Sequence, residues 1–150
     1  MLWQDSELAE DMTQELFVKV IENLANFDTK RSFKTWLFSM ANNMCKNAYR
    51  HRKVEEKAAM HLAYVKPEYA NEAQKKYDQK VFLEELEKSL NEMDSKKREA
   101  FILRYKHDLS IKEIAVVVGA KEGTIKSRMF NALKELGVQL SNFNPRKNHG

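Results

Sequence analysis

Residues 110–136 have the sequence SIKEIAVVVGAKEGTIKSRMFNALKEL, and this pattern predicts two short helices joined by a tight turn. Ser110 caps the first helix, because its hydroxyl can accept from the amide of Glu113 while the Glu113 carboxylate reaches back to the Ser110 amide. Gly119 ends this helix, since glycine enters the left-handed conformation without a Cβ penalty. Ala115 is small where a second helix has to cross closely.

The second helix has an apolar face and a cationic face. Hydrophobic side chains recur on one face at helical spacing: Ile125, Met129, Ala132, Leu133 and Leu136. Polar and basic side chains are left on the other: Lys126, Ser127, Arg128, Asn131 and Lys134. This is the layout of a helix-turn-helix unit, whose second helix enters the major groove of DNA. A helical hairpin with a solvated face is the alternative, but the capping box, small residue, glycine and basic face in this order favour DNA binding.

Composition predicts an all-α protein with one domain or two small ones. The 150 residues include four glycines and two prolines, and none of the glycines precedes Gly119. Turn-rich β architectures need more such residues. The single cysteine, Cys45, excludes an internal disulfide and fits a buried residue in a reducing cytoplasm. No apolar run approaches the ~20 residues of a membrane span.

Motifs for metal or nucleotide chemistry are missing from the sequence. The four histidines and the one cysteine lack the spacing of metal ligands, and there is no glycine-rich phosphate loop. We therefore expect no metal, no cofactor and no enzymatic activity of the chain alone.

Charge alternates along the chain. The net charge is −5 over residues 1–27, +5 over 28–57, −3 over 58–95 and +7 over 96–150. Two basic segments separated by an acidic one predict two contacts with a polyanion. The acidic amino-terminal segment should avoid phosphate, which leaves it free for a protein partner.

This pattern predicts two small helical domains joined by a flexible charged linker. The first domain spans residues 1–53, the linker 54–87, the second domain 88–140 and a disordered tail 141–150. Three apolar positions inside the linker predict a helix that leads into the second domain: Val81, Phe82 and Leu86. Two domains on one tether can bind two sites on one duplex.

A first helix is expected over about residues 6–25. Its apolar stripe consists of Leu8, Met12, Leu16, Val20 and Leu24. A second face carries Asp11, Gln14, Glu15 and Val18. From the residues alone, a solvated acidic face is the favoured interpretation.

A long helix should follow, capped by Ser32. Its inner stripe consists of Phe33, Leu37, Ala41, Met44 and Ala48, and the neighbouring stripe of Trp36, Met40, Asn43, Asn47 and Arg50. Asparagine is a poor helix former, so a pair one turn apart suggests a use. Asn43 and Asn47 can donate to and accept from base edges, and an aromatic with a basic rim suits unstacked bases. Taken alone, the Trp36 stripe favours a core over a nucleic-acid platform.

Three segments together resemble a bacterial RNA polymerase sigma factor, and specifically the small two-domain extracytoplasmic-function group. They are AEDMTQELFVKVIENLANFD, SFKTWLFSMANNMCKNAYRHRK and LNEMDSKKREAFILRYKHDLSIKEIAVVVGAKEGTIKSRMFNALKEL. The similarity covers residues 6–53 and 88–138. It implies core RNA polymerase, promoter DNA and an anti-sigma factor as partners, a cytoplasmic location and no membrane insertion.

The resemblance also implies roles for individual residues. The polymerase core would be bound by Asp11, Gln14, Glu15 and Val18. The minus-ten element would be melted by a base-capturing loop over residues 27–32 and by a set comprising Lys30, Arg31, Trp36, Asn43, Asn47 and Arg50. The minus-thirty-five duplex would be contacted by Thr124, Lys126, Ser127, Arg128 and Asn131. Family members often have a basic residue where Asn131 stands.

Family members usually have another helix ahead of the one at 6–25, so we expect that helix to be missing. Two helices alone leave one side open, and the first domain should then self-associate or be partly unfolded. The second domain should stay folded around Ile102, Leu103, Ile114, Ala115, Ile125, Met129 and Leu133. Two alternative functions remain: a stand-alone helix-turn-helix regulator that binds a palindrome as a homodimer, and a truncated decoy for an anti-sigma factor.

Overall fold

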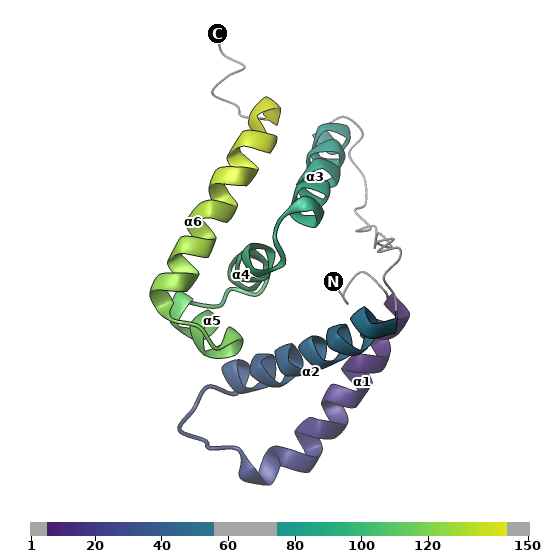
Figure 1. Cartoon of the computed structure of the whole chain (residues 1–150), viewed down its shortest axis with the longest axis vertical. Coiled ribbons are helices and arrows are strands. Elements are labelled where there is room, and N and C mark those ends of the chain that lie inside the picture. The colour runs from purple at the N-terminus through teal and green to yellow at the C-terminus, as the bar shows by residue number, and fades with distance from the viewer. Residues whose placement is uncertain (1–5, 56–74, 144–150) are drawn as a thin grey trace. The chain divides into compact units, whose positions relative to one another are not determined.

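The computed structural model describes residues 6–55 and 75–143, and every regular element in these ranges is a helix (Figure 1). The all-α prediction is confirmed for the described residues. The chain divides into two compact units, which are treated separately below. None of the helices described is both long and apolar enough to cross a membrane.

The first unit is a pair of helices. Helix α1 (Ser6–Asn23) continues into one 3-10 turn, η2 (Leu24–Asn26), and α2 (Phe33–Glu55) runs back toward the start of α1 (Figure 1). The side-chain amide of Asn23 donates to the carbonyl oxygen of Lys19 at 2.8 Å, where α1 ends. Asparagine competes with the backbone for such carbonyls, which is why it favours helix ends.

The predicted apolar stripe of α1 is correct except at its end. Leu8, Met12, Leu16 and Val20 are partly covered, but Leu24 is exposed. Leu24 lies in the 3-10 turn, whose three residues per turn rotate it off the α-helical stripe. Phe33 was expected to point inward and is also exposed. Its ring lies at the loop, where it contacts Phe27 and Trp36, and not on the inner stripe of α2.

The core of the first unit is thin. Within residues 6–51, Met44 is the only buried hydrophobic side chain. A cavity of about 140 Å³ lies between the two helices, lined by Ala9, Met12, Thr13, Leu16, Ala41, Met44 and Cys45.

We therefore expect amide hydrogen exchange in the isolated protein to be much faster in α1 and α2 than in α6. Local opening costs less free energy where few apolar contacts have to be broken. Exchange measured by mass spectrometry over residues 8–48 tests this, with light scattering to detect self-association. A monodisperse monomer with equal protection in both units would contradict the expectation.

The second unit contains four α-helices and a closing 3-10 turn. These are α3 (Lys75–Glu92), α4 (Ser95–Tyr105), α5 (Ile111–Val118), α6 (Glu122–Gln139) and η3 (Ser141–Phe143). Both α3 and α4 pack against α6, and Figure 1 shows α4 end-on beside it. One cluster has Met93, Ala132 and Leu136 at its centre, surrounded by Leu86, Leu90, Phe101 and Leu140.

Most helix-turn-helix signals of the sequence are present in the structure, but within the described residues the Glu113 carboxylate does not accept from the Ser110 amide. The hydroxyl of Ser110 accepts from the amide of Glu113 at 3.1 Å, and Gly119 has a φ of 69°. Ile114 and Ile125 are fully buried. Leu133 was expected in the core and is 45% exposed. The buried stripe of α6 runs through residues 125, 129, 132 and 136, which leaves Leu133 at its edge.

The second unit extends beyond residues 88–140 in both directions. Apolar residues recur at helical spacing on both sides of residue 88 in α3. Leu86 therefore packs on the cluster together with Leu90. Phe143 of η3 meets Phe82 edge-on, with ring centroids 5.5 Å apart. Residues 141–143 are therefore folded and do not belong to a disordered tail, whereas 144–150 lie outside the described residues, as does 56–74 of the expected linker.

A buried arginine joins α3 to α4. Arg98 is 8% exposed, and its guanidinium donates to the carbonyl oxygens of Leu90, Asn91 and Met93 at 2.5, 2.9 and 2.6 Å. These carbonyls lie where α3 ends, and carbonyls at a helix end have no partner inside the helix.

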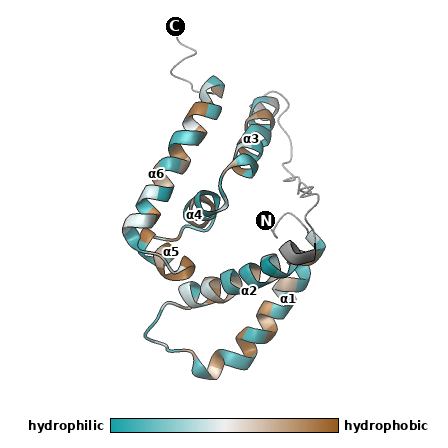
Figure 2. Cartoon of the chain, in the orientation of Figure 1, coloured by the Kyte–Doolittle hydropathy of each residue, from teal (hydrophilic) through white to brown (hydrophobic). Residues whose placement is uncertain are grey.

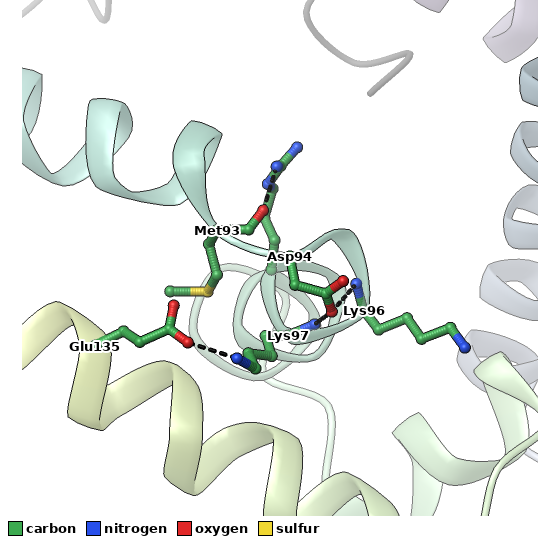
Figure 3. A network of polar contacts seen from close by, with 6 residues as sticks. Met93, Asp94, Lys96, Lys97 and Glu135 are labelled. Carbon is green, nitrogen blue, oxygen red and sulfur yellow. Dashed lines mark hydrogen bonds and ion pairs between the residues drawn. The ribbon is translucent and has the colours of Figure 1, made fainter. Parts of the chain in front are cut away.

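Asp94 caps the start of α4 by accepting from the amides of Lys96 and Lys97 (Figure 3).

Arg98→Ala should destabilise the second unit by about 2–4 kcal/mol, because the carbonyls it satisfies would be left buried without donors. Urea denaturation followed by far-UV circular dichroism measures the change. Lys96→Ala, at an exposed position two residues away in α4, should change the free energy of unfolding by less than about 0.5 kcal/mol. Equal stability of the two variants would contradict this role of Arg98.

An ion pair links α4 to α6. The Lys97 amine donates to a carboxylate oxygen of Glu135 (Figure 3), and this hydrogen bond raises the pKa of Lys97 above its usual value. A raised pKa means that folding favours the protonated amine. The stabilisation that the ion pair gives to the fold is therefore fully present below the ordinary lysine pKa. It is lost as the pH rises through the raised pKa of Lys97.

Candidate nucleic-acid interface

Helix α6 presents the predicted upstream DNA contacts to solvent. Its buried stripe fixes its rotation, so that the opposite side faces outward. Thr124, Ser127 and Asn131 are exposed and share one face at i, i+3 and i+7. Lys126 is exposed on one flank of that face, and Arg128 is half-buried on the other. All five predicted residues therefore lie on the outward side of one helix.

Apolar side chains also lie on the outward side of α6. Phe130 is 67% exposed and follows Lys126 by one turn, and the exposed Leu133 lies beside Phe130. Side chains of this kind can touch the methyl group of thymine or the sugars of the backbone.

A cluster of three aromatic rings holds the loop between α1 and α2. The ring centroids of Phe27 and Phe33 are 5.6 Å apart, those of Phe27 and Trp36 are 4.9 Å apart, and those of Phe33 and Trp36 are 5.6 Å apart. Trp36 is half-buried in this cluster, which favours a packing role over direct stacking on a base. Lys30 and Arg31 are exposed in the loop itself.

The polar stripe of α2 starts at this loop. Asn43, Asn47 and Arg50 are exposed at i, i+4 and i+7, and their stripe leads back through Met40 to Trp36. Neither asparagine side chain hydrogen-bonds to another described residue. The two amides are therefore available to a ligand, on the same helix whose start holds the loop.

The acidic face of α1 is exposed at all its predicted positions: Asp11, Gln14, Glu15 and Val18. Glu15 lies 3.8 Å from Lys19, and an ion pair this exposed contributes little to stability. We did not predict the apolar extension of this face. Ile21 is 75% exposed one turn beyond Val18, and Phe17 is 61% exposed. Both lie off the inner stripe, so the signal available in the sequence was two hydrophobic residues outside the predicted stripe of this helix. Figure 2 shows apolar and polar residues interspersed along α1.

Two family models match the chain. The model for sigma-70 region 2 matches residues 2–54, and the model for sigma-70 region 4 matches residues 83–136. The chain belongs to the sigma-70 family. The first match contains α1 and α2, and the second begins inside α3 and ends inside α6. The protein is therefore a promoter-recognising sigma factor, a class of transcription initiation factor without enzymatic activity of its own.

Curated relatives place this sigma factor in the extracytoplasmic-function group. It is similar to the ECF RNA polymerase sigma factor EcfG of Rhodopseudomonas palustris, with 28% identity over 91% of this chain and 73% of the relative. It is equally similar to the ECF RNA polymerase sigma factor SigW of Bacillus subtilis, with 28% identity over 88% of this chain and 75% of the relative.

Solved structures share the fold. The sigma factor RpoE of Bartonella quintana, solved with the anti-sigma factor NepR, has a TM-score of 0.74 and 26% identity over 90% of this chain and 82% of RpoE. CnrH, solved with the cytosolic domain of CnrY, has a TM-score of 0.63 and 22% identity over 93% of this chain and 75% of CnrH. The CnrH comparison supports the fold alone.

Proposed function

We propose that this sigma factor binds core RNA polymerase in the cytoplasm and directs initiation with a separate surface in each unit. The observation that carries the proposal is the presence of regions 2 and 4 on one chain, each with an outward polar helix face. A stand-alone regulator needs no region 2, and a decoy needs no polar helix face suited to DNA.

The surfaces divide the work between them. The outward face of α6, which carries Ser127 and has Arg128 on its flank, binds the minus-thirty-five duplex. The loop over residues 27–32 and the stripe through Asn43 and Asn47 bind the minus-ten element as it opens. The acidic face of α1 docks on core polymerase.

Binding supplies the free energy for melting. Extruding a base costs a few kcal/mol of stacking and pairing, which contacts to the captured base offset. Attachment of both units to one polymerase raises the effective concentration of each unit at its DNA element. Neither contact then has to be tight alone.

An anti-sigma factor is the expected regulator. The RpoE structure contains the anti-sigma factor NepR. By extension, the exposed apolar residues of this chain, including Phe17, Ile21 and Phe130, would be covered when such a partner is bound.

A gel shift on promoter DNA separates the three functions. A sigma factor shifts the DNA strongly only when core polymerase is added. A regulator shifts it alone, and a decoy does neither. Binding by the isolated chain with an affinity equal to that of the holoenzyme would contradict the proposal.

Two substitutions on α6 should have different effects. Arg128→Ala should cost about 1–3 kcal/mol and relax the preference at one upstream position, if its guanidinium contacts a base. Lys134→Ala should weaken binding of all sequences alike and reduce the salt dependence, as loss of a phosphate contact does. Holoenzyme binding to a promoter library at two salt concentrations measures both. Unchanged sequence preference in the Arg128 variant would remove that residue from base recognition.

A further inference from the structure

The loop between α1 and α2 is folded around Asp28. One carboxylate oxygen of Asp28 accepts from the amide of Lys30 at 3.0 Å, and the Asp28 carbonyl oxygen accepts from the amide of Arg31 at 2.9 Å. The second carboxylate oxygen lies 3.9 Å from Nε of Arg31. These contacts define a β-turn with aspartate at its first position, where its side chain reproduces a backbone acceptor.

Both ends of the loop are held independently of Asp28. Phe27 precedes the turn and Phe33 follows it, and their rings pack on each other and on Trp36. Ser32 caps α2, with its hydroxyl accepting from the amide of Thr35 at 3.3 Å. Asp28 therefore holds the middle of a loop whose ends are already anchored.

We propose that Asp28 is a positioning residue for base capture: it fixes the turn that presents Lys30 and Arg31 before DNA arrives. The proposal rests on the function proposed above, in which this loop captures an extruded base. A preformed loop binds without the entropic cost of ordering its backbone.

The amide hydrogen bond matters more than the charge of Asp28. The side chains of Asp28 and Arg31 are 55% and 82% exposed, and ion pairs at such sites contribute little. A carboxylate beside DNA phosphates is also repelled by them. Asp28 therefore contributes through the side-chain oxygen that accepts from the amide of Lys30. Asparagine keeps such an oxygen, and alanine lacks it.

The test compares Asp28→Ala with Asp28→Asn in holoenzyme. The DNA is a set of premelted promoter templates, each with a single abasic site placed in turn along the minus-ten element. On the intact template, Asp28→Ala should bind about five- to tenfold more weakly than wild type, which corresponds to the loss of one hydrogen bond. Asp28→Asn should restore most of the affinity. At one abasic position, wild type and Asp28→Ala should bind equally, because there is no base to capture.

Binding to core polymerase is measured for both variants to monitor the fold. If Asp28→Ala weakens DNA binding equally on the intact template and on every abasic template, the substitution has a general structural effect. That result would overturn the proposal. Equal binding of Asp28→Ala and wild type to the intact template would overturn it as well. These two outcomes differ from the one expected if the proposed function itself is wrong. In that case the wild-type holoenzyme would show no promoter-dependent binding.

Discussion

Asp11→Arg should abolish the binding of this sigma factor to core RNA polymerase. Asp11 is exposed on the acidic face of α1, so the substitution should not disturb the fold. It would replace an attractive charge with a repulsive one inside the interface. Like charges across an interface cost several kcal/mol, so we expect a loss of at least about 100-fold in affinity.

Fluorescence anisotropy with labelled sigma factor and purified core measures this loss. Glu84→Arg is the matched control, because it makes the same charge change at an exposed position of α3. The control should bind core normally. Retained core affinity in the Asp11 variant would mean that the acidic face is only a solvated surface.

The double substitution Asn43→Ala and Asn47→Ala should impair open-complex formation by at least about 30-fold while core binding stays intact. Each well-placed amide contact to a base is worth about 1–3 kcal/mol. The helix should tolerate both changes, since alanine is the better helix former. Premelted bubble templates should restore part of the activity, because the cost of opening the duplex has then been removed.

Permanganate reactivity of unpaired thymines measures the open complex. Lys34→Gln, at an exposed position of α2 away from the asparagine stripe, is the control and should behave as wild type. Equal transcription by wild type and the double variant would refute the assignment of these two residues.

The helix-turn-helix could be predicted because its signals are local. The Ser110 cap, the positive φ of Gly119 and the buried Ile125 each depend on residues within one or two turns. The same holds for the exposure of Asn43 and Asn47, which follows from helical spacing.

The features that escaped prediction depend on contacts between different helices, turns or loops. The partner of Phe143 is Phe82, so nothing near residue 143 indicated a folded turn. A lone arginine in a charged segment gives no sign that Arg98 is buried against the end of α3. For Trp36 the sequence favoured a core over a platform, but it did not show that Phe27 and Phe33 are the rings that pack against it.

Start-specific transcription in a purified system tests the central claim most directly. Core polymerase, this sigma factor and a library of promoter fragments are combined, and the 5′ ends of the transcripts are mapped. We expect defined start sites that require the sigma factor and that share two upstream sequence elements at fixed spacing. Transcripts with no preferred start site, or the same start sites with core polymerase alone, would contradict the account.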